Sequence, residues 1–403
     1  MKLKRFINDT KIFIFLFLIF IDRKIILYPI YIHPFYLKPK KPILSIDHSQ
    51  NETLARGRNF LDKCLNIPNN FTYEYINFPK ASIIIPIYNC EETIEASIRS
   101  IQYQNFTKIE IILVNDFSDD NTPKIISNLQ KNDKRIKIVN NKSNRGTLYS
   151  RSLGALMSRG KYIFNLDNDD MYFDFDVFDE IYKKIRTEKL DIVGFLTVNI
   201  FNYNTKIKKM KNLYTYQYEE DLFLKQPELS TWMIKFKGNF LVHNNMIWDK
   251  CIKSKLYKDA LSSIGMDRIS KFIIWGEDTS IVFIILSLAK TFQYIYKYGI
   301  AHFKGNTTAS NTEPIFLKIY GDIFFLDIAF DFSKNNTEEK NLVIGQAFYI
   351  YKRYNFNVFN NDTNSIYLRQ VLNKIIKCKY LNKKNKRKLS KIFSDFFIYN
   401  TDD

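Results

Sequence analysis

Cysteine is scarce in this sequence of 403 residues, and its four cysteines lie far apart along the chain: Cys64, Cys90, Cys251 and Cys378. This spacing excludes a metal knuckle and a paired redox motif, because both need cysteines a few residues apart. It also defines no disulfide framework. Cysteine usage therefore leaves the cellular compartment open.

A long apolar run is also missing. The run from Ile12 to Ile21 follows several basic residues, but as a helix it would span only about 15 Å, half of a ~30 Å hydrocarbon core. A full span must continue through the charges at 22–24 into 25–32, and their cost offsets the gain from the apolar residues. No Ala-x-Ala-like cleavage site follows. Residues 1–32 are predicted to be a targeting or membrane-anchor segment for the secretory pathway (ER or Golgi). A cytoplasmic protein is the alternative.

Acidic residues are few relative to basic ones, with 42 Asp and Glu against 60 Lys and Arg, so the formal net charge is +18. Lysine is abundant throughout the chain, together with Asn, Ile, Phe and Tyr, which makes the charge a property of the whole composition. We therefore predict that the protein does not bind nucleic acid. The charge is equally compatible with an anionic nucleotide-sugar or a membrane surface. Apolar residues make up 46%, enough for a full core.

A change of pattern divides the chain near residue 80. Residues 33–79 contain scattered prolines and no sustained period, which is typical of a stem or linker. From Ala81 onward, strand-like apolar runs alternate with segments of helical spacing, which predicts an α/β domain over residues 80–310. The expected strands are 82–85, 109–114, 136–139, 162–166 and 192–198, and the expected helices are 91–104, 123–132, 147–158 and 176–187.

The predicted fold is a mostly parallel, Rossmann-like central sheet with flanking helices, because continuous apolar strands fit a sheet that is covered on both faces. Residues 201–270 are less regular, and 271–305 return to apolar segments around a short acidic motif. Residues 311–403 have a helical pattern and form a predicted C-terminal extension. Its basic stretch Lys383–Lys391 is typical of a solvated helix face.

Polar motifs follow three of the expected strands: Ile85–Asn89, Val114–Asp120 and Leu166–Asp170. In an open α/β sheet, ligands bind where loops leave the carboxyl ends of the strands. Pro86 gives a stiff exit from the first strand, and Asn89 is expected to cap the helix that follows. Turn formation alone would also explain the first two motifs.

The acidic run DNDD at residues 167–170 is more informative. Clustered carboxylates repel each other and resist desolvation, so a fold seldom places them beside a buried strand without a cation. Hard ions such as Mg²⁺ or Mn²⁺ prefer oxygen ligands and leave room for substrate phosphates. A fourth motif, WGED at 275–278, precedes the apolar run 281–288. Its acid pair could be ordinary helix capping or could supply a general base.

In this order and spacing, the four motifs resemble the family 2 glycosyltransferases with the GT-A fold. The matching stretches are SIIIPIYN, EIILVNDFSDDNT, NRGTLYSRSLGALMSRGKYIFNLDNDD and WGEDTSIVFIIL, and the resemblance covers roughly residues 81–310. The sequence departs from the family pattern at Phe117, where glycine is usual, and at Asn115, which replaces the first acid.

For the donor, the resemblance implies contacts with the base, the ribose and the diphosphate of a nucleotide-sugar. The residues that would make them are Pro86, Tyr88, Asn89, Asp116, Arg151 and Asp167. Arg151 would face the diphosphate, and Asp169 would ligate the Mn²⁺ or Mg²⁺ that bridges the two phosphates. His302 would approach the metal or the diphosphate, although a lone histidine after a strand is as often structural.

For the reaction, the resemblance implies a single displacement with inversion at the anomeric carbon. Asp278 would deprotonate the acceptor hydroxyl as general base, and Glu277 beside it would orient the acceptor. The implied donor for this metal-dependent hexosyl or hexosaminyl transfer is a nucleotide-diphosphate sugar, with UDP favoured. The acceptor would be a glycan, glycolipid or glycoprotein.

The acceptor side has one candidate segment, residues 245–260. It contains Trp248-Asp249-Lys250 and resembles the variable part of the family that builds the acceptor side. Trp232, Trp248 or Trp275 could line it, because aromatic rings stack on sugar faces, but core packing is the simpler explanation for each.

Three alternatives stay open. A non-catalytic GT-A-like protein that binds nucleotide or glycan would not need the acids Asp169 and Asp278, and both are present. A nucleotidyltransferase would be expected to carry a glycine-rich phosphate loop with a basic residue after the first strand, and PIYNCEET has neither. A membrane-associated interaction protein would leave the four ordered motifs unexplained.

Overall fold

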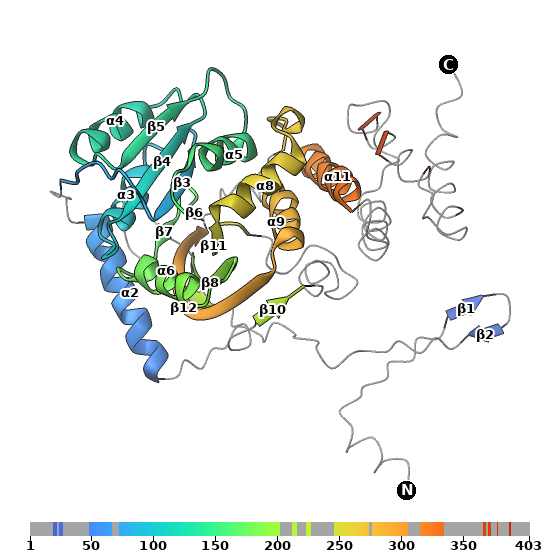
Figure 1. Ribbon diagram of the computed structural model, residues 1–403, viewed down its shortest axis with the longest axis horizontal. Coiled ribbons are helices and arrows are strands. Elements are labelled where there is room, and N and C mark those ends of the chain that lie inside the picture. The colour runs from blue at the N-terminus through green and yellow to red at the C-terminus, as the bar shows by residue number, and fades with distance from the viewer. Residues whose placement is uncertain are drawn as a thin grey trace, which may run out of the picture. The chain divides into compact units, whose positions relative to one another are not determined.

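The computed structural model is shown in Figure 1. It describes residues 19–21, 24–26, 48–66, 72–201, 212–215, 223–226, 246–273, 276–304 and 315–333, with a few single positions after 365. The chain divides into two compact units, residues 1–41 and 42–403. In the first, β1 (Ile19–Ile21) and β2 (Lys24–Ile26) form an antiparallel pair. Most of the predicted targeting segment lies outside the described residues, and none of the helices within them is both long and apolar enough to span a bilayer.

The second unit is built on a sheet with the strand order β10-β12-β8-β11-β6-β3-β4-β5. Its parallel half consists of β6 (Tyr162–Asn165), β3 (Ala81–Ile87), β4 (Ile109–Asn115) and β5 (Ile136–Asn140). Every residue of β3 and β4 is buried, as expected for strands covered on both faces. The sequence predicted all four strands to within a few residues.

The other half of the sheet is mixed. Its strands are β7 (Met171–Tyr172), β8 (Ile192–Phe201), β9 (Asn212–Thr215), β10 (Phe223–Lys225), β11 (Lys250–Lys253) and β12 (Thr291–Lys304). β8 and β12 are parallel, but β11 lies between β6 and β8 and runs antiparallel to both. The expected parallel arrangement is therefore confirmed from β6 to β5, whereas β11 makes the sheet mixed beyond that point.

Helices cover both faces of the sheet (Figure 1). On one face lie α3 (Ile94–Gln102), α4 (Thr122–Asn132) and α6 (Val177–Thr187), and on the other lie α5 (Thr147–Met157), α8 (Ser254–Ile264), α9 (Glu277–Leu288) and α11 (Ile315–Phe332). Alternation along β3 explains how one strand serves both layers. Ile83 and Ile85 pack in the first core, while Ile84 packs in the second. The described residues of the predicted helical extension include all of α11.

Within residues 33–79, which were predicted to be a stem or linker, the structure forms the helix α2 (His48–Asn66). Leu54, Leu61 and Leu65 of α2 are buried and pack against residues of β7, β8 and β12. Their spacing of seven and four is a helical signal. The prolines that suggested a linker all lie before or after the helix, so they mark its flanks.

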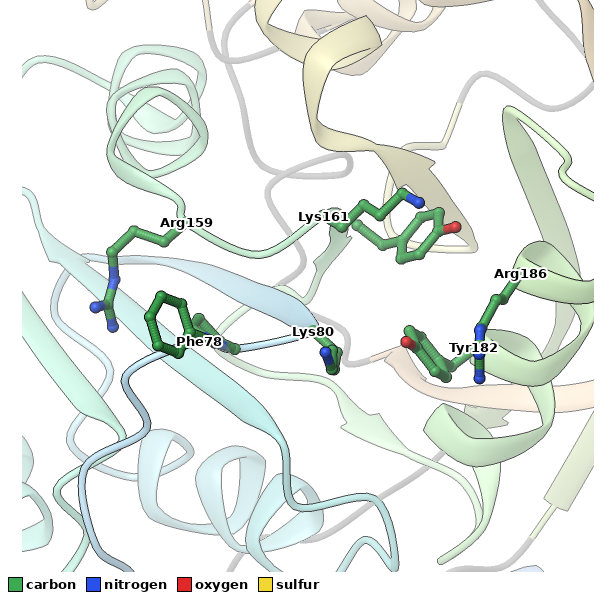
Figure 2. Close-up of a pocket in the computed structure, with 8 residues that line it drawn as sticks. Phe78, Lys80, Arg159, Lys161, Tyr182 and Arg186 are labelled. Carbon is green, nitrogen blue, oxygen red and sulfur yellow. The ribbon is translucent and has the colours of Figure 1, made fainter.

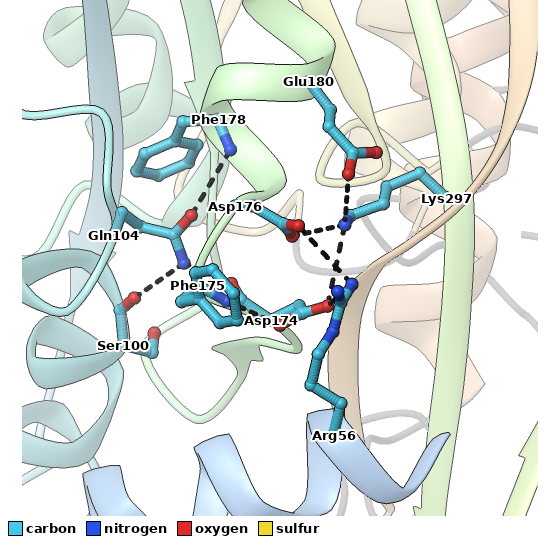
Figure 3. Close-up of polar contacts among 9 residues, drawn as sticks. All are labelled: Arg56, Ser100, Gln104, Asp174, Phe175, Asp176, Phe178, Glu180 and Lys297. Atoms are coloured by element: carbon cyan, nitrogen blue, oxygen red, sulfur yellow. Dashed lines mark hydrogen bonds and ion pairs between the residues drawn. The ribbon is translucent and has the colours of Figure 1, made fainter. Parts of the chain in front are cut away.

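A network of charges fixes α2 to the sheet, as Figure 3 shows. Arg56 of α2 pairs with Asp174, and Lys297 of β12 pairs with Asp176 and lies 3.0 Å from Glu180. The side chains of Asp174 and Lys297 are only 1% and 7% exposed. Burial would raise the pKa of Asp176, but its contacts with Lys297 and Arg56 outweigh burial and lower it. We call these five residues the Lys297 network.

Candidate active site

The carboxyl ends of β3, β4 and β6 meet at one edge of the sheet, because these strands are parallel. The predicted donor-side residues that follow these ends are Tyr88, Asn89, Asp116 and Asp167. Hydrogen bonds link the loops. Asp116 N donates to Ile87 O at 2.8 Å, and Asn168 Nδ2 donates to Pro86 O at 3.2 Å. The topology therefore brings these residues together, as the sequence predicted.

Asn89 joins the loop after β3 to the loop after β4. Its side-chain oxygen accepts from Asp119 N at 3.0 Å, its Nδ2 donates to the Asp119 carboxylate at 2.7 Å, and its backbone N donates to Ser118 Oγ at 3.1 Å. The φ of Asn89 is 43°, in the left-handed region that asparagine tolerates. The predicted capping role is wrong, because α3 begins at Ile94 with Thr93 as its N-cap.

Two aromatic side chains are exposed in these two loops, Tyr88 by 47% and Phe117 by 57%. The φ of Phe117 is 68°, which costs a bulky residue about 1–2 kcal/mol and a glycine almost nothing. This explains in physical terms why glycine suits the position that Phe117 occupies. Both rings are accessible to a ligand, and an aromatic face can stack on a nucleobase.

Asp116 organises the turn that precedes α5. Its side chain is buried and accepts three hydrogen bonds, from Asn141 Nδ2 at 2.7 Å, from Arg145 N at 2.8 Å and from Gly146 N at 2.7 Å. Gly146 has a φ of 86°, which a residue with a side chain adopts only with strain. Asp116 thus fixes the direction in which α5 leaves the edge of the sheet.

Arg151 of α5 lies at the centre of the site. Its Nη2 donates to Asp167 Oδ1 at 2.9 Å, and its Nε lies 3.7 Å from Asp278 Oδ1. Burial alone would lower the pKa of Arg151, but the carboxylates of Asp167 and Asp278 raise it, so the guanidinium is charged. Arg151 Nε and Nη1 and Asp278 Oδ1 are buried without a hydrogen-bond partner in the described part of the chain. Buried polar atoms of this kind are typical of a site that a ligand completes.

Glu277 and Asp278 form the first turn of α9, after Gly276 with a φ of 66°. Asp278 Oδ2 accepts from Ile247 N at 3.0 Å. Burial raises the pKa of Asp278 to about 6, although Arg151 opposes the shift. Burial and the charge of Asp278 raise the pKa of Glu277 to about 8. A carboxylate with a pKa just below neutrality is suited to act as a general base.

The DNDD run divides its acids between two environments. Asp169 has an exposed side chain, but protein atoms around its carboxylate displace water. This desolvation and the charges of Asp170 and Asp167 raise the pKa of Asp169 to about 7. Asp170 is fully buried and lies 2.9 Å from His302 Nδ1, while its Oδ1 accepts from Phe303 N at 3.1 Å. Asp170 belongs to the acidic run from which a cation site was predicted, but no separate role was predicted for it.

His302 is held in place by Asp170 and by Trp248, whose ring stacks on the imidazole with centroids 5.3 Å apart. Burial alone would lower the pKa of His302, but Asp170 raises it to about 9. The contact with Asp170 occupies Nδ1, so Nε2 is the ring nitrogen that would meet the metal or the diphosphate.

Asp169 and Asp167 are the residues whose chemistry fits a divalent metal. Among the described residues, no three acidic, histidine or cysteine side chains stand together as ligands for an ion. Mg²⁺ is nevertheless often bound through one or two carboxylates and completed by substrate phosphates and water. Desolvation is the main cause of the raised pKa of Asp169, but the charges of Asp170 and Asp167 add to it, and a divalent cation would offset that part.

The family profile described as Glycosyl transferase family 2 matches residues 82–248. The chain carries a family 2 glycosyl transferase domain. The chain is 39% identical over 116 residues to the uncharacterized glycosyltransferase EpsJ of Bacillus subtilis (strain 168), covering 29% of this chain and 33% of EpsJ. The glycosyltransferase GlyG of Streptococcus pneumoniae serotype 4 is 25% identical over 187 residues, which cover 46% of this chain and 60% of GlyG. The match thus spans less than two thirds of each relative.

Campylobacter jejuni supplies a relative with a more specific name, GalNAc(5)-diNAcBac-PP-undecaprenol beta-1,3-glucosyltransferase. It is 39% identical over 93 residues, which cover 23% of this chain and 30% of that protein. Among solved structures, S. aureus TarS 1–349 in complex with UDP-GlcNAc has a TM-score of 0.56 and 14% identity, over 79% of this chain and 88% of that one. At this identity the likeness concerns the fold, and it confirms the predicted GT-A fold.

The Trp248-Asp249-Lys250 motif predicted for the acceptor side is buried, in contrast to the exposed Tyr88 on the donor side. Trp248 is 7% exposed and packs in the core, and Lys250 is fully buried and pairs with Asp249 at 2.6 Å. Tyr294 Oη donates to the other oxygen of Asp249 at 3.0 Å. These side chains support His302 and β11, whereas Trp232 and Trp275 lie outside the described residues.

Proposed function

We propose that this protein is an inverting glycosyltransferase that moves a sugar from a nucleotide-diphosphate sugar, with UDP as the favoured nucleotide, to a hydroxyl of a glycan, glycolipid or glycoprotein. The observation that carries the proposal is the buried guanidinium of Arg151, held between Asp167 and Asp278 with two nitrogens that have no hydrogen-bond partner among the described residues. A diphosphate oxygen would accept hydrogen bonds from these donors. The family 2 domain supports the same chemistry.

Asp278 is the proposed general base. Its pKa of about 6 leaves it ionised at neutral pH, and Ile247 N fixes one oxygen while the other has no hydrogen-bond partner in the described residues. The free oxygen would take the proton from the acceptor hydroxyl as positive charge develops at the anomeric carbon. Glu277 beside it would orient the acceptor.

Asp169, with Asp167, would hold Mn²⁺ or Mg²⁺. When bound, such an ion would neutralise charge on the leaving diphosphate. Arg151, and His302 through its outer ring nitrogen, would contribute positive charge on the same side. Membrane association and delivery to the secretory pathway through residues 1–32 remain part of the proposal.

A donor screen tests this function. The full chain is incubated with UDP-, GDP- and CMP-sugars, with and without Mn²⁺, and nucleotide release is followed. We expect metal-dependent release from one donor that falls to background in Asp169→Ala. Asp179→Ala, which removes an exposed acid from the first turn of α6, is the matched control and should leave release unchanged.

Two other outcomes would change the proposal. Metal-dependent UDP binding without release, even with a panel of glycan and glycolipid acceptors, would favour the non-catalytic nucleotide-binding alternative. Neither binding nor release would contradict the proposal as a whole.

A further inference from the structure

A pocket lies at the amino edge of the parallel half of the sheet (Figure 2). Its volume is about 430 Å³, and its walls come from the segment leading into β3, from the turn between α5 and β6, and from α6. The candidate active site lies at the opposite edge, one strand length or about 23 Å away for a strand of seven residues. A ligand in this pocket would therefore not compete with a donor nucleotide.

In the wall of this pocket, Arg159 pairs with the buried carboxylate of Glu110. Glu110 is 2% exposed and accepts from Arg159 Nε at 2.9 Å, from Arg159 N at 2.6 Å and from Ser82 Oγ at 2.6 Å. Burial would raise the pKa of Glu110, but these hydrogen bonds outweigh it and lower the pKa. Gly160 brings the turn against β3, where a Cβ would lie 2.5 Å from the carbonyl carbon of Ala81. The charge of Arg159 is thus neutralised within the fold.

The other three cations of the pocket are Lys80, Lys161 and Arg186. All three are exposed, and none forms an ion pair with a carboxylate in the described part of the chain. Figure 2 shows their side chains around the same opening. Three uncompensated positive charges around one cavity attract an anion with more than one charged oxygen, and a phosphate group has this chemistry.

Aromatic side chains stand beside these cations. Phe78 is 85% exposed in the wall of the pocket, and Tyr75 just before it is 55% exposed. Tyr182 packs edge-on against Tyr162 with ring centroids 5.8 Å apart. An exposed apolar ring next to lysine and arginine is typical of surfaces that lie at a membrane interface, because the ring enters the headgroup layer while the cations meet lipid phosphates.

We propose that this pocket binds the phosphate group of an anionic phospholipid, so that the amino edge of the sheet docks on a membrane surface. The contact is independent of the N-terminal apolar run and of the proposed glycosyl transfer. It would leave the opposite edge of the sheet, with the candidate active site, open to its substrates.

Vesicle co-sedimentation of the full chain tests the proposal. Wild type is compared with Lys80→Gln/Lys161→Gln/Arg186→Gln on phosphatidylcholine vesicles with and without phosphatidylglycerol. Because any effect of the apolar N-terminus is common to both proteins, the loss of binding specific to phosphatidylglycerol isolates the pocket. We expect roughly 100-fold weaker binding to the anionic vesicles, since each cation near such a surface contributes about fivefold.

The matched control removes the same charge from the opposite edge of the sheet, as Lys124→Gln/Lys142→Gln/Lys271→Gln. All three lysines are exposed. Lys124 and Lys142 lie in the segments that follow β4 and β5, and Lys271 lies against Gly146. An equal loss in the control and the pocket variant would overturn the proposal, because net charge alone would then explain binding. Circular dichroism and the melting temperature verify that each variant is folded.

Two further measurements separate the sources of phosphate. Phe78→Ser should weaken binding to both kinds of vesicle by about tenfold, because the ring supplies apolar area and no charge. Titration with inorganic phosphate is the other measurement. Pocket-dependent binding of free phosphate, with vesicle binding unchanged by the triple substitution, would overturn the membrane assignment in favour of a soluble phosphate ligand.

Discussion

The Lys297 network and the candidate active site both gather charged side chains beside the central sheet, but they pair them differently. In the Lys297 network, two cations and three carboxylates are interleaved, and each has an ion-pair partner. In the candidate active site, Arg151 faces Asp167 and Asp278, with Glu277 next along the helix, and two of its nitrogens have no hydrogen-bond partner among the described residues. The charged groups of the Lys297 network are thus paired with one another, whereas the candidate active site has polar atoms that can bind a ligand.

This difference gives opposite dependences of stability on pH. The pKa of Asp176 in the Lys297 network is lowered by folding, so its contribution to stability is present above its usual value of 3.8 and is lost on acidification. The pKa of Glu277 is raised from 4.5 to about 8, so the folded state holds its proton more tightly than the unfolded state. Its contribution therefore declines as pH rises from about 4.5 to 8. A fold tolerates such a cost where function requires it.

The largest expected effect comes from Asp278→Asn, which removes the proposed base and keeps the shape of the side chain. Turnover should fall at least ~100-fold, at the low end for the loss of a general base, while UDP binding survives. Steady-state nucleotide release and UDP titration measure the two effects. Asp259→Asn, an exposed acid of α8, is the control. Near-normal turnover of Asp278→Asn would remove Asp278 from the base role.

Substitution in the Lys297 network should lower stability and leave turnover unchanged. Lys297→Met removes one of the two cations that Asp174 and Asp176 share, and we expect the free energy of unfolding to fall by roughly 2 kcal/mol, because the buried Asp174 and the partly buried Asp176 lose a charged partner. Turnover per folded molecule should not change. Urea unfolding and nucleotide release test both parts. A large loss of turnover at unchanged stability would show that the two clusters are not functionally distinct.

Much of this contrast could be predicted from the sequence, because strand ends are local signals. The four parallel strands follow from continuous apolar runs, and their carboxyl ends brought Asp116 and Asp167 to one edge as predicted. The acid pair of α9 and Arg151 of α5 also followed from motif order. The structure adds that Asp167 and Asp278 both contact the guanidinium of Arg151.

The Lys297 network could not be predicted in this way. Arg56 and Asp174 are 118 positions apart in the chain, and no short motif signals that their elements meet. The direction of β11 was hidden for the same reason, because a strand of four residues between β6 and β8 is placed by tertiary pairing. Asp170 stood in the DNDD run, but its buried pairing with His302 depends on β12 arriving from far along the chain.

Acidification offers a graded way to sharpen the comparison. With a pKa of about 6, Asp278 should lose its proton-accepting form as pH falls, so kcat/KM should decrease about tenfold per pH unit below pH 6. The rate is measured from pH 5 to 8 within the range in which circular dichroism remains native. The residual kcat/KM of Asp278→Asn should not show this decrease on acidification. A decrease of equal slope in that variant would assign the titration to another group.

The smallest expected effect concerns the backbone at the edge of the candidate active site. Phe117 has a φ of 68° and an exposed ring, so its backbone strain is not offset by burial of the side chain. Phe117→Gly removes that strain but adds flexibility to the unfolded chain, and the net gain should be about 1 kcal/mol in the free energy of unfolding.

Urea unfolding measures the gain, with Tyr88→Gly as the contrasting variant, because Tyr88 is also exposed but is not among the residues with positive φ. If Phe117→Gly is stabilised and also binds UDP more weakly, the strain is retained for a contact between the ring and the nucleotide. If Phe117→Gly is destabilised, the ring of Phe117 stabilises the loop. The left-handed backbone would then not be explained by ligand binding.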